Sequence, residues 1–151
     1  MTLSNHPMPE IAVAFRARCG NISGALFANA IRFTLRQEKR HAAMISCVVV
    51  TDAEIHELNR RFLKHDYPTD IITFPLEDDP IEAELVISAD TARRQAREYK
   101  VTMREECARL AIHGVLHLCG YDDRSEEDRA AMKSREDFHV RRYMKNERTR
   151  H

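Results

Sequence analysis

Two histidines four residues apart, His113 and His117, lie within an apolar stretch of the chain. In a helix this spacing places both imidazole rings on one face, one turn apart. Gly120 follows, and a residue without a side chain can adopt the left-handed conformation that ends a helix. The chain reversal can then bring the carboxylate of Asp123 back toward the two rings. Zinc accepts two imidazoles and a carboxylate as ligands, with a fourth position left for water. The pattern therefore predicts an open, catalytic type of site for one Zn²⁺ ion, held by His113, His117 and Asp123.

Two further carboxylates could take part in the same chemistry. Asp122 directly precedes Asp123, so the sequence leaves open which of the two is the third ligand. Asp70 lies in a Pro-Thr-Asp segment that leads into an apolar run. We treat Asp70 and Asp122 as candidate catalytic residues that handle a proton or orient the metal ligands. The simpler alternative is that each carboxylate only caps a turn.

Length and composition predict one soluble domain. A chain of 151 residues can bury a sizeable core, so we expect a single domain over residues 1–151. No apolar run is long enough to span a membrane, and nothing near residue 1 is typical of a secretory signal. The four cysteines are scattered, which favours reduced, buried thiols. These features predict a cytoplasmic protein, and they set no oligomeric state.

The overall charge gives no support for a nucleic-acid partner. The chain has 24 basic and 24 acidic residues, so its formal net charge is zero. Support for RNA binding must therefore come from local patches. The segment 141–150 has five basic residues against one acidic residue, and it is a candidate for contact with RNA or the ribosome. Residues from about 145 to 151 are equally well explained as a disordered basic tail.

Four short apolar runs predict β-strands, at residues 11–15, 45–50, 71–74 and 85–88. We expect Pro75 to end the third strand. The acidic segment 77–84 contains Pro80 and is typical of a solvated loop or a hairpin.

Five stretches have apolar residues at helical spacing: two lie between the first three strands, and three follow the last strand. Asn21 is a candidate cap for a helix that extends to about residue 36. The later helices are expected to begin at capping residues, namely Thr51, Ser88 or Asp90, Thr102, and Ser125. The element order favours an α+β fold, with helices that cover a small β-sheet.

The stretch from His113 to Asp123 resembles the signature of the YbeY family of bacterial endoribonucleases. That signature reads His-Gly-x-Leu-His-Leu-x-Gly-Tyr-Asp-His, and the chain matches it at every fixed position except the last. There, Asp123 replaces the usual third histidine. A carboxylate can replace an imidazole on zinc, but it is shorter and adds a negative charge. The family's fold resembles that of zinc proteases, so the resemblance implies a small mixed β-sheet covered by helices, with a zincin-like metal helix.

A second block of resemblance covers Leu58 to Asp70, where the family has Leu-Asn near a helix end and Pro-Thr-Asp before a strand. Family members commonly carry a functional arginine in this block, and Leu63 occupies its position here. Leucine cannot bind a phosphate. Nearby cations, Arg60, Arg61 and Lys64, are candidate substrate-binding residues in its place, although basic residues on a helix surface are usually only solvated.

The resemblance implies a zinc-dependent endoribonuclease specific for single-stranded RNA, which acts in maturation of the 16S rRNA 3′ end and in ribosome quality control. Its expected partners are RNA and ribosomal particles. One alternative is a metallopeptidase-like hydrolase, although Gly114 stands where His-Glu-x-x-His peptidases carry their general base. Another is a non-catalytic ribosome assembly factor with a structural metal.

Overall fold

A four-stranded mixed sheet forms the centre of the molecule, in a computed structural model that describes residues 7–149. The strands are β1 (Glu10–Phe15), β2 (Ala42–Val50), β3 (Ile71–Asp78) and β4 (Ile81–Ser88). Their order in the sheet is β1-β2-β4-β3. The β1–β2 and β2–β4 pairs are parallel, and β3 and β4 form an antiparallel hairpin. The sheet is therefore mixed, as the sequence predicts.

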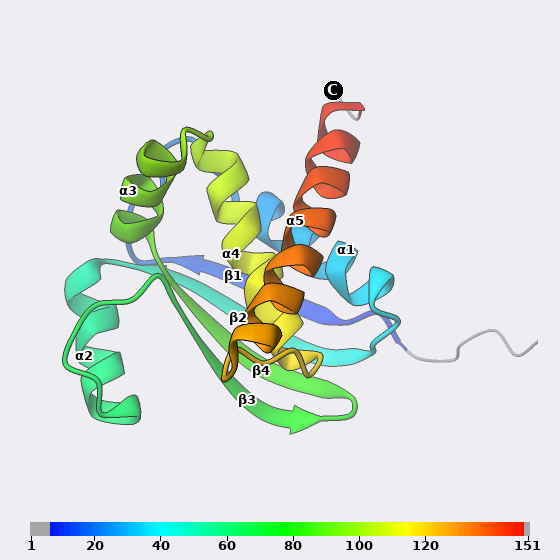
Figure 1. The fold of residues 1–151 in the computed structure, drawn as a ribbon, viewed down its shortest axis with the longest axis horizontal. Helices are drawn as coiled ribbons and strands as arrows, with labels where there is room; N and C mark the ends of the chain where they lie inside the picture. Colours follow the sequence, from blue (N-terminus) through cyan, green and yellow to red (C-terminus); the bar gives the residue numbers. More distant parts are fainter. Residues whose placement is uncertain (1–6, 150–151) are drawn as a thin grey trace, which may run out of the picture.

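Five helices pack around the sheet: α1 (Gly24–Gln37), α2 (Asp52–Leu63), α3 (Ala89–Tyr99), α4 (Met103–Leu118) and α5 (Glu126–Thr149). Helices α1, α4 and α5 cover one face, and α2 lies apart from them (Figure 1). The alternation along β2 explains this division, because Cys47 and Val49 join the large core while Val48 and Val50 pack with Ile55 of α2. The predicted α+β architecture is confirmed.

Most of the predicted helix starts are confirmed. The side chains of Thr51, Ser88 and Thr102 each accept a hydrogen bond from a backbone N–H in the first turn of the helix they precede. The Asn21 cap is wrong, because α1 begins after Ser23. Asn21 lies instead inside a turn that is closed by the hydrogen bond from the Ile22 N–H to the Cys19 carbonyl.

The prediction that Pro75 ends its strand is also wrong. Strand β3 continues to Asp78, and Pro75 pairs with Ala83 of β4. Proline lacks a backbone N–H, but β3 is an edge strand and its register shifts between Pro75 and Glu77. Edges and bulges are the places where a sheet accepts proline. Of the two structures predicted for the acidic segment 77–84, a solvated loop or a hairpin, the segment forms the hairpin.

The basic C-terminal segment is helical as far as it is described. Where a disordered tail was considered from about residue 145, α5 continues through Thr149. Glu147 forms an ion pair with Arg104 of α4, and the Tyr143 hydroxyl donates a 3.1 Å hydrogen bond to the Leu26 carbonyl of α1; both contacts hold this part of the helix against the core. Residues 150 and 151 lie outside the described part of the chain.

The thiols are reduced, as the sequence predicts, and three of the four are buried. Within residues 7–149, no helix is long and apolar enough to cross a lipid bilayer.

Candidate metal centre

His113 and His117 lie on one face of α4, with their ring centroids 4.8 Å apart. Their side chains are 30% and 27% exposed, so both rings are half-buried but reachable from solvent. From residue 110 to residue 118, the other side chains of α4 are apolar and buried in the core, for example at Leu110 and Leu116. This half of the helix is therefore packed between the sheet and its neighbours, and the two imidazoles are its partly exposed side chains.

Gly114 explains how α4 can lie so close to the sheet. A Cβ atom on this residue would be 2.9 Å from the terminal methyl groups of Ile71 in β3 and Leu85 in β4. A side chain at this position would therefore point at the sheet and not toward the two rings. The position that carries the general base in His-Glu-x-x-His peptidases cannot serve that purpose here.

We expect Gly114→Glu to destabilise the protein severely, because it forces a carboxylate into the apolar contact between α4 and the sheet. Gly114→Ala is the matched control, since one methyl group can be accommodated by small shifts of the Ile71 and Leu85 side chains. Urea denaturation should show a loss of about 1–3 kcal/mol for alanine and no cooperative transition for glutamate. A glutamate variant as stable as the alanine variant would contradict this packing.

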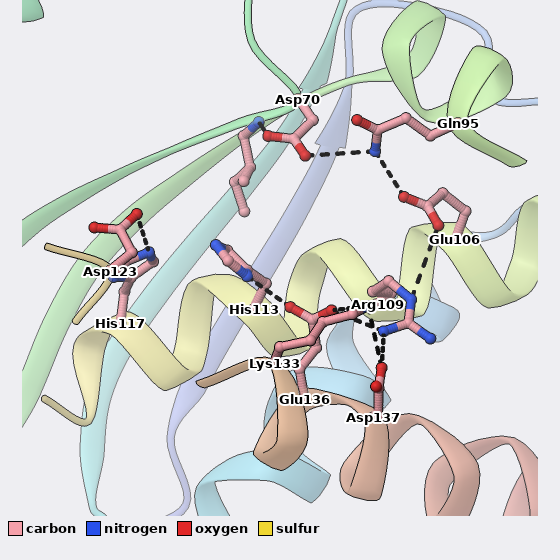
Figure 2. A network of polar contacts seen from close by, with 11 residues as sticks. Asp70, Gln95, Glu106, Arg109, His113, His117, Asp123, Lys133, Glu136 and Asp137 are labelled. Carbon is pink, nitrogen blue, oxygen red and sulfur yellow. Dashed lines mark hydrogen bonds and ion pairs between the residues drawn. The ribbon is translucent and has the colours of Figure 1, made fainter. Parts of the chain in front are cut away.

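The turn after α4 brings Asp123 toward the rings. Gly120 has φ +102°, a conformation that side chains disfavour, and it turns the chain at the helix end as predicted. Asp123 Oδ2 is then 3.8 Å from His117 Nε2 (Figure 2). Two donors on one tetrahedral zinc ion are about 3.3 Å apart, given bonds of about 2.0–2.1 Å. The two donor atoms would therefore fit one zinc ion if they moved slightly closer together. However, no group of three ligand side chains among residues 7–149 already has metal-binding geometry, and the ligand trio stays a prediction.

Asp122 makes different contacts. Its Oδ1 accepts a hydrogen bond of 2.7 Å from the Asp123 N–H, and its Oδ2 is 3.1 Å from Nε of Arg124. These are the contacts of a turn-capping carboxylate. The geometry thus favours Asp123 over Asp122 as the third ligand.

A buried carboxylate, Glu136 of α5, fixes the orientation of the first histidine. Its Oε1 lies 2.6 Å from His113 Nδ1, and its Oε2 accepts a hydrogen bond of 2.7 Å from Arg109 (Figure 2). When Nδ1 donates to a carboxylate, the other ring nitrogen is the one left to bind a metal. The Glu136–His113 pair is therefore the arrangement that commonly supports a metal-ligating histidine.

The electrostatics of the two rings differ. Burial alone lowers the pKa of His113, but the hydrogen bond and charge of Glu136 outweigh it and hold that pKa above its ordinary value. Burial and the charge of neighbouring His113 lower the pKa of His117, which favours the neutral ring that metals bind. Burial raises the pKa of Glu136, yet hydrogen bonds from His113 and Arg109 outweigh that effect and lower it. Glu136 is therefore a stable anion.

Asp70 approaches the site from the start of β3. Its Oδ1 accepts a hydrogen bond of 2.8 Å from the Ile71 N–H, and its Oδ2 is 3.4 Å from the Gln95 side-chain nitrogen. Gln95 also donates a 2.7 Å hydrogen bond to Glu106, which is only 1% exposed. Burial raises the pKa of Glu106. Its other oxygen lacks a hydrogen-bond partner within the described chain and lies 4.0 Å from Nε of Arg109.

A cavity of about 640 Å³ connects these groups. It brings together three of the predicted site residues, Asp70, His113 and Asp123. It is also lined by polar residues that the sequence analysis did not select, namely Gln95, Glu106, Arg109, Arg129, Lys133 and Glu136.

The sequence model of the family described as Endoribonuclease YbeY matches residues 21–144. The chain belongs to the YbeY family. The Endoribonuclease YbeY of Chloroherpeton thalassium is 44% identical over 112 residues, which are 74% of this chain and 79% of that protein. The Endoribonuclease YbeY of Chlorobium luteolum is 38% identical over 120 residues, 79% of this chain and 88% of the relative. The solution structure of TM1509 from Thermotoga maritima is 26% identical, with a TM-score of 0.66 and 93% of each chain covered.

Membership of the YbeY family makes the chain a nuclease, and hence a hydrolase. It also identifies a metal-dependent enzyme, without saying which metal it uses. The family signature covers the end of α4 and the turn that carries Asp123. The two half-buried histidines and the cavity lie in this part of the structure.

The cations predicted to replace the family arginine lie elsewhere in this YbeY chain. Arg60 forms an exposed ion pair of 2.6 Å with Glu57, and the Arg61 guanidinium lies over the Phe62 ring. Lys64 is the left-handed residue that ends α2. None of the three lines the cavity among the residues described. Their role in substrate binding stays a prediction.

Two other cations lie at the cavity, on α5. Arg129 donates a 3.2 Å hydrogen bond to the Asp123 carbonyl, and Lys133 lies 3.2 Å from the Asp137 carboxylate. Their spacing of four residues, directly after the family signature, places them on one face of a helix. This spacing was the sequence signal that could have identified Arg129 and Lys133 as cavity residues. The signal can be interpreted only when α5 is known to pack beside α4.

Proposed function

We propose that this chain is a zinc-dependent endoribonuclease specific for single-stranded RNA, which acts on the 3′ end of 16S rRNA and in ribosome quality control. One observation carries the proposal. His113, oriented by Glu136, and His117 lie on one face of α4, beside a cavity that also holds Asp123 and Asp70. YbeY family membership supplies the nuclease chemistry, and RNA is the substrate that the relatives' name states.

His113, His117 and Asp123 would hold the metal ion. When bound, zinc polarises a phosphoryl oxygen and lowers the pKa of a water molecule. The chain's own groups then have separate tasks. Glu136 orients His113, and Asp70, which lines the cavity, can accept a proton at Oδ2, whose one hydrogen bond among residues 7–149 is the weak contact of 3.4 Å with Gln95.

Substrate binding falls to the cations at the cavity. Arg129 and Lys133 lie on its rim, where a phosphate of the RNA backbone could reach both. The charge of Lys133 is partly neutralised by Glu136 and Asp137, whereas Arg129 donates a hydrogen bond to the uncharged Asp123 carbonyl; these contacts fix the positions of both cations. Contact with ribosomal particles in the cytoplasm is part of the same proposal.

The metallopeptidase alternative has less support from the geometry. The position of the peptidase general base is Gly114, which faces the sheet. Of the other carboxylates at the cavity, Glu136 is tied to Arg109 and Glu106 to Gln95. A non-catalytic assembly factor would use the same residues to hold a structural metal, and only activity separates it from the nuclease.

Substrate choice tests the proposed function. Zinc-loaded protein is incubated with a labelled single-stranded RNA, the same RNA annealed to its complement, and casein. We expect cleavage of the single strand alone. Cleavage of casein with no cleavage of RNA would establish the peptidase. No cleavage of any substrate, with co-sedimentation on ribosomal particles, would establish the assembly factor.

Glu136→Gln should weaken zinc affinity by about 10–100-fold, because the amide no longer offers His113 a charged acceptor. Glu147→Gln is the matched control, since it removes a carboxylate from the same helix and also breaks an ion pair with an arginine. Competition with a fluorescent zinc chelator measures the affinity. Equal affinities in the two variants would show that Glu136 does not support a metal ligand.

A further inference from the structure

A second cavity, of about 490 Å³, lies at the C-terminal end of α1, beneath the segment that precedes β1. Its described lining includes four cationic side chains that the candidate metal centre does not use: Arg32, Arg36, Lys39 and Arg40. His41 also lines it, and no acidic residue does within the described chain. A protein with no net charge therefore gathers positive charge at one place.

Most of this charge is unpaired. Arg32, Arg36 and Lys39 form no ion pair with any carboxylate in the described part of the chain, whereas Arg40 lies 3.3 Å from the Asp78 carboxylate. Glu38, the carboxylate within the same segment, is bound instead to Arg135 and His139 of α5. Arg32 and Arg36 are four residues apart on α1, where like charges repel one another. An anion bound between them would relieve that repulsion.

Apolar groups lie beside the cations. Met8, which is 81% exposed, and Leu35 line the same cavity together with two prolines. Cations beside apolar side chains and the His41 ring suit a polynucleotide, because its phosphates bind cations and its bases pack on rings and apolar surface. A simple phosphate ion would use only the first of these features.

Glu38, which is flanked in the sequence by the lining residues Arg36 and Lys39, connects this region to the turn that carries Asp123. The Tyr121 hydroxyl, two residues before Asp123, donates a 3.1 Å hydrogen bond to Glu38 at the end of α1. The connection between α1 and β2 accordingly lies at the same end of the molecule as the turn after α4 (Figure 1). One strand of RNA could therefore contact both places.

We propose that this cavity is a second RNA-binding site, in which Arg32, Arg36 and Lys39 bind the phosphates of single-stranded RNA outside the catalytic cavity. The inference rests on the proposed function for its choice of ligand. Its contribution is to substrate affinity, since none of these cations lines the cavity that contains His113.

The salt dependence of RNA binding tests this site. The probe is a labelled single-stranded RNA with methylated ribose hydroxyls, whose intact length is verified on a gel after each titration. Fluorescence anisotropy gives Kd for the full chain at several salt concentrations. The double variant Arg36→Gln/Lys39→Gln should bind more weakly. The slope of log Kd against log salt should fall by roughly 1.4, because each lost phosphate contact on a single strand contributes about 0.7.

The chain offers a closely matched control on α3. Arg97 lies in the last turn of α3 and Lys100 is its left-handed C-cap, just as Arg36 lies in the last turn of α1 and Lys39 has φ +56° directly after its C-cap. Arg97→Gln/Lys100→Gln removes the same charge and the same helix-end interactions. It should leave the slope unchanged. A second pair, Arg32→Gln/Lys39→Gln, should reproduce the effect of the first.

Equal losses in the α1 and α3 variants would overturn the proposal, because general surface charge would then explain the binding. An unchanged slope in both α1 variants would overturn it as well. Tighter binding of free AMP than of the RNA, abolished by the α1 variants, would assign the cavity to a nucleotide and not to a polynucleotide. The assay requires no cleavage, so a wild-type protein that fails to cut RNA contradicts the proposed function and leaves this test intact.

Discussion

Replacing Arg109 by methionine should lower the free energy of unfolding by about 3–5 kcal/mol, the usual cost of removing one partner from a buried ion pair. The Arg109 side chain is 18% exposed, and it lies 2.7 Å from Glu136 and 2.6 Å from Asp137. Methionine keeps the apolar volume but leaves Glu136 and Glu106 without their shared cation. Urea denaturation at neutral pH measures the loss.

The effect of Arg109→Met should depend on pH. The pKa of Glu136 is lowered in the folded protein, so its contribution to stability is present above its ordinary pKa and is lost as the pH falls through the folded value. Removing the cation therefore costs most at neutral pH and least in acid. Arg60→Met, which breaks an exposed pair with Glu57, should change stability little at any pH. Equal losses in both variants would contradict a buried network.

Replacing Asp123 by alanine should abolish metal-dependent RNA cleavage, whereas Asp123→His should retain it. Histidine is the residue found at this position of the YbeY signature, and an imidazole there can supply a nitrogen donor where Asp123 supplies an oxygen. The result is expected because Asp123 Oδ2 lies 3.8 Å from His117 Nε2, near the spacing of two donors on one ion. Initial cleavage rates across a zinc titration measure it.

Asp122→Ala decides between the two adjacent carboxylates. The oxygens of Asp122 bind the Asp123 N–H and Arg124, so its loss should loosen the turn and weaken zinc binding without removing a ligand. Added zinc should then restore cleavage in Asp122→Ala and not in Asp123→Ala. The reverse pattern would make Asp122 the third ligand.

The sequence allowed the metal helix and its cap to be predicted because both depend on local spacing. Thr102 caps α4, and the interval between His113 and His117 is one helical turn. Short apolar runs predicted the strands, and the resemblance to the YbeY family predicted that they form a mixed sheet. The prediction that Pro75 ends its strand was wrong because a strand at the edge of a sheet can contain proline. Whether a strand lies at the edge depends on the whole sheet and not on the local sequence.

The residues that hold the two histidines in position could not be predicted from local sequence spacing. Glu136 lies 23 residues after His113, and only the packing of α5 against α4 brings them together. The same is true of Arg109, Gln95 and Glu106, whose polar contacts cross between elements. The net charge of zero also gave no indication of the cations at the end of α1, because a net charge does not say where the charged residues lie in the fold.

The most direct test of the central claim compares RNA cleavage by metal-stripped wild-type protein, with and without added zinc, with cleavage by His117→Ala under the same conditions. Circular dichroism first confirms that the variant is folded. We predict that zinc restores cleavage in the wild-type protein and that His117→Ala stays inactive at every zinc concentration. Cleavage by metal-stripped protein, or full activity of His117→Ala, would contradict a metal site on α4.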